Sequence, residues 1–308
     1  MEEQLPASEE SSGMVKSGEK MKLFYSEKFL EYYEPGHPEA PARLKAIVDH
    51  LARHARAEFE EPRACPEETL LLAHSAEFLN LLKSEKFFER DSPALPGIYR
   101  YAVLSCGSAL QAMQEASGGQ TAFSLARPPG HHAGRCRVGG FCYLNNMAVA
   151  ALAACQAGRK VAVIDLDGHH GNGTEEILRG RENVIYVSLH QVPAYPGTGL
   201  SSFENCYNFP LPPGTGGKKY LATLDRALKV VAKFSPEILG ISLGLDTHEC
   251  DPLLELCLKD NDYRSIGFQL SKLGRPAFVV LEGGYDPETI GHAFHCFLQG
   301  LTRKETKP

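Results

Sequence analysis

Three side chains in this sequence have the types and the setting that a bound metal ion needs. Asp167 and His169 stand two residues apart, directly after an apolar run and within a segment, 165–173, that holds two aspartates, two histidines and three glycines. Residues two apart at the end of a strand point the same way, so these two side chains can share one ion. A carboxylate and an imidazole suit zinc, and a catalytic zinc site has three protein ligands and one open position. Asp246, which follows a later apolar run, is the predicted third ligand.

Four more polar residues and one tyrosine could carry proton transfer beside such an ion. His131 and His132 follow a stiff Pro-Pro-Gly turn. Either ring could take a proton from an attacking water, and the same ring or its neighbour could pass one to a leaving amine. Tyr285 could donate its hydroxyl to a carbonyl oxygen as negative charge develops there. Asp165 and Asn172 could orient the two histidine rings. The predicted chemistry is hydrolysis of an amide.

Each of these residues also has an interpretation without chemistry. Asp167, Asp165 or Asn172 could cap a following helix, and His169 could be a satisfied polar residue in a tight turn. A histidine pair taken alone is more often a surface feature, and a tyrosine next to glycine usually marks a turn. The metal interpretation is favoured because the glycines around His169 let the backbone turn sharply and approach an ion closely.

The apolar pattern predicts an α/β framework that would position these residues. Short apolar runs alternate with helical patterns, which is typical of buried parallel strands covered on both faces by helices. The clearest predicted strands are 22–25, 121–125, 160–164, 183–189, 238–243 and 277–281, and the clearest predicted helices are 42–56, 147–157 and 221–234. Four polar clusters directly follow strands, at 127–133, 165–173, 245–247 and 282–285. Because ligands bind beyond the carboxyl ends of strands in open sheets, we expect these clusters to converge on one site.

Composition bounds the class of protein. A chain of 308 residues with 43% hydrophobic content can form one large domain, which we place at 21–308, whereas 1–20 has the Glu, Ser and Gly content of a disordered tail. A net charge of -6 and a pI near 6.1 provide no basic surface for direct binding to nucleic acid or to a membrane. Nine scattered cysteines, no apolar run long enough to span a bilayer and no signal pattern predict a cytoplasmic protein.

Six motifs, in this order along the chain, resemble those of the histone deacetylase family, which includes bacterial deacetylase-like amidohydrolases and acetylpolyamine amidohydrolases. They are RPPGHHA (127–133), GGFCYLNN (139–146), DLDGHHGNGT (165–174), YPGTG (195–199), GLDTHECDPL (244–253) and LEGGYD (281–286). The resemblance covers most of the chain from His37 onward. It implies the arginase/deacetylase fold, a single α/β domain whose central parallel sheet of about eight strands is flanked by helices.

The resemblance also implies roles for residues of the site. The three predicted ligands would hold zinc, His132 would be the general base, His131 its electrostatic partner, and Tyr285 would polarise the acyl carbonyl. Further residues would bind substrate in a narrow tunnel: Gly140 through its carbonyl, Phe141 and Tyr195 as walls, and Asp91 at the rim. Tyr195 stands where the family often has Phe. Two ring faces could hold the methylene chain of an acyl-lysine or of an acyl-polyamine.

Relatives in the family also bind potassium close to the zinc, largely through backbone carbonyls. By the same resemblance, the candidate potassium ligands in this chain are Asp165, Asp167, His169, Ser188 and Leu189. Carbonyl ligands leave no side-chain signature, so the sequence itself does not test this site.

The activity predicted from these observations is zinc-dependent removal of an acetyl or other acyl group from acyl-lysine in proteins or peptides. The nearest alternative is an acetylpolyamine amidohydrolase. Animal polyamine-selective relatives carry glutamate where this chain has Leu253, which favours acyl-lysine, although bacterial polyamine enzymes use other means. A two-manganese ureohydrolase would need further acidic ligands, and a catalytically silent acyl-binding scaffold would need no proton carrier. The natural substrate, the acyl length and the oligomeric state stay open.

Overall fold

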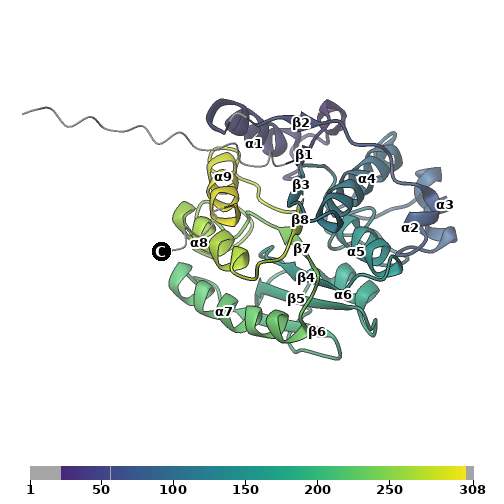
Figure 1. Cartoon of the computed structure of the whole chain (residues 1–308). Coiled ribbons are helices and arrows are strands. Elements are labelled where there is room, and N and C mark those ends of the chain that lie inside the picture. The colour runs from purple at the N-terminus through teal and green to yellow at the C-terminus, as the bar shows by residue number, and fades with distance from the viewer. Residues whose placement is uncertain (1–21, 56, 303–308) are drawn as a thin grey trace, which may run out of the picture.

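Eight strands of the described residues form one parallel sheet (Figure 1). The computed structural model describes residues 22–55 and 57–302, so the predicted tail at 1–20 lies outside the described residues. The strand order is β2-β1-β3-β8-β7-β4-β5-β6, and every pairing is parallel. The strands are β1 (Lys22–Phe24), β2 (Phe59–Glu60), β3 (Ala122–Ser124), β4 (Val161–Asp165), β5 (Val184–Gln191), β6 (Cys206–Leu211), β7 (Ile238–Leu243) and β8 (Ala277–Leu281). The predicted α/β fold with about eight parallel strands is confirmed.

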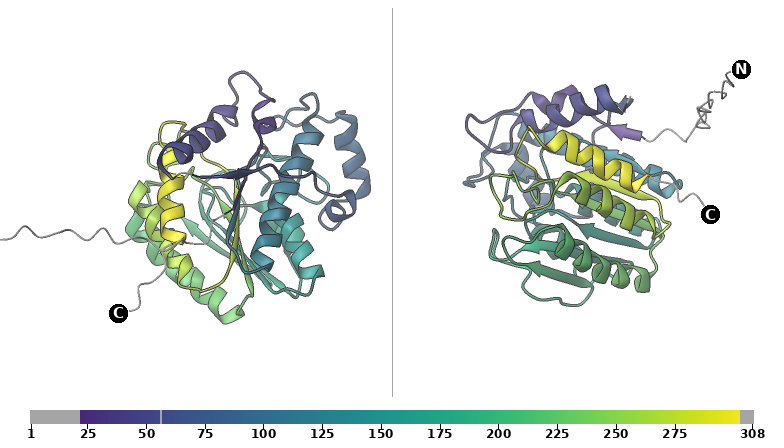
Figure 2. Two further views of the ribbon diagram at one scale, coloured as in Figure 1. Left: turned by 45° about the horizontal axis from the view of Figure 1, so that its top comes forward. Right: turned by 90° about the vertical axis from the view of Figure 1, so that its left-hand side faces the viewer.

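Helices cover both faces of this sheet, as both views of Figure 2 show. One layer consists of α1 (Pro41–His54), α7 (Gly217–Phe234), α8 (Asp260–Ser271) and α9 (Ile290–Leu301), preceded by the short 3-10 helix η1 (Glu27–Leu30). The other consists of α2 (Glu67–Leu70), α3 (Ala76–Ser84), α4 (Ile98–Ser117), α5 (Asn146–Gln156) and α6 (Asn172–Leu178). Along β4, Val161 and Val163 join the core under the second layer, whereas Ala162 and Ile164 join the core under the first. Alternating side chains of a strand buried on both faces therefore supply two cores.

Predicted and observed elements agree best in the centre of the sheet. β7 and β8 have the predicted bounds, and β3, β4 and β5 differ from the predicted strands by one or two residues at their ends. Two strands at the sheet edges, β2 and β6, have no counterpart among the clearest predicted strands. β2 has only two residues. In β6 buried positions alternate with more exposed ones, and the strand contains Asn208 and Pro210, so neither strand gives the continuous apolar run of a central strand.

The strand order places the four polar clusters next to one another. The clusters follow β3, β8, β7 and β4, and these four strands are consecutive neighbours in the sheet. Parallel strands have their carboxyl ends at the same edge, so segments separated by up to about 150 positions in the chain meet there. The expected convergence at one sheet edge is thus a consequence of the topology.

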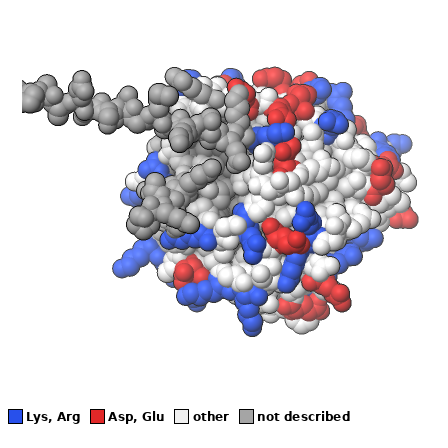
Figure 3. Space-filling view, in the orientation of Figure 1, with Lys and Arg blue, Asp and Glu red and all other residues white. Residues whose placement is uncertain are grey.

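The surface and the helices agree with the composition. On the face drawn in Figure 3, Lys and Arg side chains are interspersed with Asp and Glu side chains, and no large patch of either sign is visible among the described residues. Within the described ranges, no helix combines the length and the apolar character needed to cross a bilayer.

Candidate active site

The three predicted metal ligands lie together at the end of two neighbouring strands. Asp167 and His169 follow β4, and Asp246 follows β7. One donor atom from each lies within 4.8 Å of the other two. His169 Nδ1 is 2.7 Å from Asp246 Oδ2 and 3.2 Å from Asp167 Oδ1. All three side chains are buried. The donor set is two carboxylate oxygens and one imidazole nitrogen, which fits zinc.

Backbone groups hold the outer oxygen of each carboxylate. The N–H of Gly283 donates to Asp167 Oδ2 at 2.8 Å, and the N–H of Gly168 donates to Asp246 Oδ1 at 2.8 Å. The other two oxygens, Asp167 Oδ1 and Asp246 Oδ2, face the His169 ring, and Asp167 Oδ1 also accepts a hydrogen bond from the His169 backbone N–H at 2.9 Å. A Cβ at position 283 would stand 2.6 Å from Asp167 Oδ2, so glycine is needed there. Outer hydrogen bonds of this kind orient metal ligands.

Charge in the triad also favours a cation. Burial disfavours a charged ring on His169, but hydrogen bonds and charge from Asp167 and Asp246 outweigh burial and raise the pKa of His169 to about 10. The ring nitrogen between the two carboxylates thus attracts positive charge strongly. A divalent ion would compete with the proton for this nitrogen, so that metal binding releases a proton.

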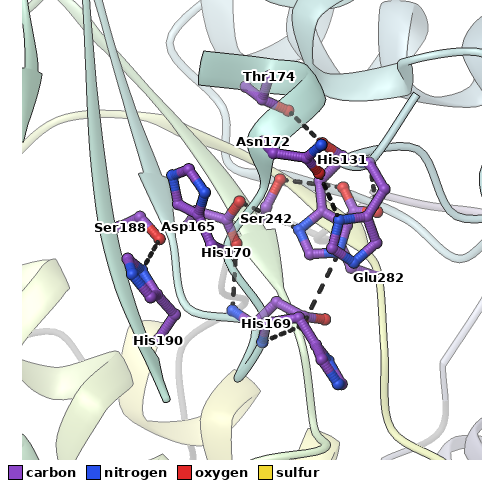
Figure 4. A network of polar contacts seen from close by, with 12 residues as sticks. His131, Asp165, His169, His170, Asn172, Thr174, Ser188, His190, Ser242 and Glu282 are labelled. Carbon is purple, nitrogen blue, oxygen red and sulfur yellow. Dashed lines mark hydrogen bonds and ion pairs between the residues drawn. The ribbon is translucent and has the colours of Figure 1, made fainter. Parts of the chain in front are cut away.

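His131 and His132 lie side by side next to the triad, with ring centroids 4.0 Å apart. His131 Nδ1 is 3.2 Å from Asp165 Oδ2, and His132 Nδ1 is 2.9 Å from Asn172 Oδ1, so both predicted partners contact the predicted rings. Figure 4 shows His131 together with Asp165 and Asn172. Asp165 Oδ2 also accepts a hydrogen bond from the Tyr186 hydroxyl at 2.8 Å, a contact that was not predicted. That contact fixes the carboxylate.

The two rings have opposite electrostatic settings. For His131, burial opposes a charged ring, but Asp167 and Asp165 outweigh it and raise the pKa to about 10. For His132, burial and the neighbouring His131 and His169 hold the pKa well below its usual range. These surroundings favour positive charge on the His131 ring and a neutral His132 ring.

A cavity of about 350 Å³ opens the site to the surface. Its lining holds the predicted tunnel residues Gly140, Phe141, Tyr195, Asp91 and Leu253 together with His132, His169 and Tyr285. The rings of Phe141 and Tyr285 have centroids 5.6 Å apart, and the Tyr195 ring stands edge-on to His132 at 5.0 Å. Tyr195 and Leu253 are 46% and 39% exposed, which places them at the open side. The cavity is therefore aromatic along its walls and polar at its base.

Gly140 allows the cavity wall that carries Phe141 to approach the histidine pair. Its φ is +53°, and a Cβ there would stand 2.3 Å from the His132 ring. Gly140 O accepts a hydrogen bond from the Cys142 thiol at 3.3 Å. Only glycine combines this backbone conformation with this clearance.

Two loops that carry cavity residues are held by buried polar contacts. Asp251 accepts from the backbone N–H of Tyr285 at 2.7 Å and from that of Leu253 at 2.9 Å, which ties the two segments together. His170 lies 2.7 Å from the Thr198 hydroxyl, and His190 lies 3.1 Å from Gly199 O. His170 follows β4, and His190 lies within β5. Both therefore anchor the loop that presents Tyr195.

The predicted potassium ligands come from the end of β4, the residues after it, and β5. Asp165 and Ser188 are register partners in β4 and β5, with Leu189 next along β5. The Ser188 hydroxyl forms a hydrogen bond with His190 Nδ1 at 2.8 Å, as Figure 4 shows. These positions neither establish nor oppose a bound monovalent ion, and the potassium site stays a prediction.

Several site residues were not among the predicted ones. Glu282 is fully buried, and its carboxylate accepts hydrogen bonds from the backbone of the histidine-pair loop. A carboxylate directly after a buried strand was a usable signal, since the LEGGYD motif contains it. Arg43, which lies over the Tyr285 ring at 4.7 Å, and His37, whose ring packs on Phe141 at 4.6 Å, gave no local signal because both lie far away in sequence.

A family model described as histone deacetylase domain matches residues 37–301. The chain belongs to the histone deacetylase family. This family member is 40% identical over 313 residues to an acetylpolyamine amidohydrolase of Mycoplana ramosa, covering 85% of the chain and 92% of the relative. It is 34% identical over 294 residues to a probable deacetylase of Archaeoglobus fulgidus, and the match covers 86% of the chain and 81% of that relative. A crystal structure of the HDA15 HD domain superimposes with a TM-score of 0.86 at 33% identity and covers 94% of the chain and 90% of that structure.

Membership of the histone deacetylase family confirms the predicted family, the arginase/deacetylase fold and the enzyme class, a metal-dependent amide hydrolase. The ureohydrolase and silent-scaffold alternatives lose their support. The metal dependence of the family agrees with the triad of two carboxylates and one imidazole at the base of the cavity.

Proposed function

We propose that this histone deacetylase family member uses zinc to remove an acetyl or similar acyl group from an amine at the end of an extended alkyl chain. The observation that carries the proposal is the meeting of Asp167 Oδ1, His169 Nδ1 and Asp246 Oδ2 at the base of an aromatic cavity, beside a histidine pair. One oxygen of each carboxylate faces the imidazole, so the three donors can enclose one ion.

A zinc ion held by Asp167, His169 and Asp246 would supply Lewis-acid chemistry to the acyl carbonyl and to a water molecule. His132 is the general base. The Nδ1–H of His132 donates a hydrogen bond to Asn172 Oδ1. Nε2 of the neutral His132 ring is then free to take a proton from the attacking water. His131, whose Nδ1 lies 3.2 Å from Asp165 Oδ2, would supply positive charge next to the developing oxyanion.

Tyr285 is the second donor to the acyl oxygen. Burial raises the pKa of its hydroxyl well above the usual range, an effect that the nearby Arg43 only partly offsets. The phenol therefore stays protonated and can donate a hydrogen bond to the oxyanion. His132 then returns its proton to the departing nitrogen as the C–N bond breaks, and the products are a carboxylate and an amine.

Two kinds of substrate present the required group, acyl-lysine and acetylated polyamine. Phe141 and Tyr195 offer ring faces to a methylene chain, and Asp91 lines the same cavity, where its carboxylate could bind a backbone N–H or a second ammonium. Leu253 favours acyl-lysine because it places no negative charge at the mouth. The resemblance to an acetylpolyamine amidohydrolase supports the polyamine alternative at least as well.

A turnover panel tests the proposal and separates the two substrates. The zinc-loaded chain is assayed on acetyl-lysine peptides, longer acyl-lysines and acetylated polyamines, with release of the free amine as the readout. A thirtyfold preference in kcat/KM corresponds to about 2 kcal/mol of transition-state discrimination and would decide the class. If the zinc-loaded chain releases no amine from any of these substrates, the proposal is wrong.

Three further proposals accompany this function. A potassium ion would be held by Asp165, Asp167, His169, Ser188 and Leu189. Residues 21–308 would fold as one domain. A cytoplasmic location is supported by the nine cysteines, none of which is paired in a disulfide, since a reducing compartment keeps thiols free.

A further inference from the structure

Four of the twelve histidines gather outside the active site, where α1 and α9 lie side by side (Figure 1). His50 and His54 belong to α1, and His292 and His295 belong to α9. Measured from the His50 ring, the centroids of His54, His295 and His292 lie at 4.5, 5.3 and 5.7 Å. None of these residues lines the catalytic cavity.

The nitrogens of two rings already have the separation of ligands on one ion. His50 Nε2 lies 3.2 Å from His295 Nδ1. Two nitrogens bound tetrahedrally at zinc–nitrogen distances of about 2.05 Å would be about 3.3 Å apart. His54 follows His50 by four residues, the helical spacing that puts two imidazoles on one face. His54 is exposed, so its ring can turn toward the other two.

Burial and charge in the cluster disfavour a second proton on the rings of His50 and His295. Burial, followed by the neighbouring His54 and His295, lowers the pKa of His50 to about 4. Burial and His292 lower the pKa of His295. Only neutral imidazole binds a metal ion, and the N–H that one of the two facing nitrogens donates to the other would move to a different ring nitrogen on binding. Gln299 Nε2 lies 3.0 Å from His295 Nε2, and Gln299 Oε1 accepts a hydrogen bond from Arg264 at 2.9 Å. This contact keeps His295 Nδ1 toward His50, with the ring proton on Nδ1 until a metal ion replaces it.

His292 is engaged elsewhere. Its Nδ1 is 3.0 Å from Asp260 Oδ2, and its Nε2 is 3.7 Å from the Cys296 thiol. Both ring nitrogens therefore have partners outside the cluster. His292 lies on the same surface but has no ring nitrogen free to bind a metal ion. It is therefore a matched control for substitutions of His50 and His295.

We propose that His50, His54 and His295 form a second metal site that binds one first-row transition-metal ion between α1 and α9. Imidazole ligands suit zinc, copper and nickel. The ion would link a helix near the start of the domain to the last helix, and it would stabilise the folded chain in proportion to its concentration.

Titration of the zinc-loaded full chain with Ni²⁺ tests the proposal, with calorimetry as the readout. We expect one further Ni²⁺ per chain, while the zinc content measured after the titration stays unchanged because Ni²⁺ does not displace the catalytic ion. His50→Gln and His295→Gln should each weaken Ni²⁺ binding by about tenfold or more, since even loss of an outer contact to a ligand costs that much. His292→Gln should change the affinity by less than about twofold.

Two further measurements make the outcome decisive. Circular dichroism of each variant confirms that the helices persist, and a rise in Tm with Ni²⁺ should occur in the wild type and in His292→Gln but not in His50→Gln. Nitrogen coupling in the Cu²⁺ electron paramagnetic resonance spectrum should report three imidazoles. The proposal is overturned if the wild type takes up no further Ni²⁺, if folded His50→Gln and His295→Gln bind it as tightly as the wild type, or if His292→Gln loses as much affinity as they do.

Discussion

Glu282 accepts a hydrogen bond from the backbone N–H of His131 at 3.2 Å, across 151 residues of sequence. The same carboxylate oxygen accepts from Gly130 N–H at 2.8 Å, and the other oxygen accepts from the Ser242 hydroxyl at 3.0 Å. Figure 4 shows Glu282 and Ser242 beside the histidine pair. Glu282 therefore links the ends of β7 and β8 to the loop after β3 that presents both imidazoles.

Removal of this carboxylate should misplace the histidine pair. Glu282→Ala leaves two buried N–H groups without acceptors, at a cost of about 1–3 kcal/mol each. We expect kcat to fall by roughly 100-fold, because small displacements of catalytic groups are costly. Glu282→Gln keeps an acceptor for the two amides and should retain most activity. Steady-state kinetics check both variants, and equal losses in Ala and Gln would contradict a positioning role.

Loss of the Tyr285 hydroxyl should reduce turnover without loss of metal. Tyr285→Phe removes one proposed donor to the oxyanion, which typically lowers kcat by roughly 100- to 1000-fold. The ring stays between Phe141 and Arg43, so the cavity wall is preserved. The assay is turnover on an acetyl-lysine peptide together with zinc content by atomic absorption. Unchanged turnover would remove Tyr285 from the mechanism.

Asp246→Asn should release the metal and leave the fold intact. The amide keeps an oxygen that can accept from Gly168 N–H, but it replaces the anionic ligand oxygen beside His169. We expect zinc affinity to fall by about tenfold or more and activity to fall with it. Metal content after dialysis and the far-ultraviolet circular dichroism spectrum give the two readouts. A folded variant with full zinc content would show that Asp246 is not a ligand.

Glu39 should make the chain sensitive to acid. Burial alone would raise the pKa of this carboxyl, but Arg127 and Arg43 outweigh it and lower the pKa from 4.5 to about 2. A lowered pKa stabilises the fold fully above pH 4.5, and the contribution is lost as the pH falls from 4.5 toward 2. The loss is on the order of 3 kcal/mol.

Denaturant unfolding between pH 6 and pH 2 measures this effect. The free energy of unfolding should fall more steeply with acid in the wild type than in Glu39→Gln, which has no carboxyl to protonate at this position. Tyr32→Phe removes only the hydroxyl contact to Glu39 at 3.0 Å and serves as a milder variant if Glu39→Gln does not fold. Parallel pH profiles of the wild type and folded Glu39→Gln would exclude Glu39 as the source.

The sequence alone determined the parts of this protein that are encoded locally. The spacing of Asp167 and His169 indicated a shared ion, and uninterrupted apolar runs gave β7 and β8 their bounds. Central strands are buried on both faces, so composition alone marks them. The positions of polar clusters after strands also predicted convergence, because parallel strands share an edge.

Only the tertiary structure decided the properties that arise from contacts between distant segments. Adjacent residues His131 and His132 have pKa values shifted in opposite directions, because one ring meets two carboxylates and the other meets an amide and two imidazoles. The buried role of Glu282 and the contact of His50 with His295 likewise depend on which strands and helices become neighbours. Electrostatic and hydrogen-bond energies depend on distances in space and on burial, and a linear pattern contains neither.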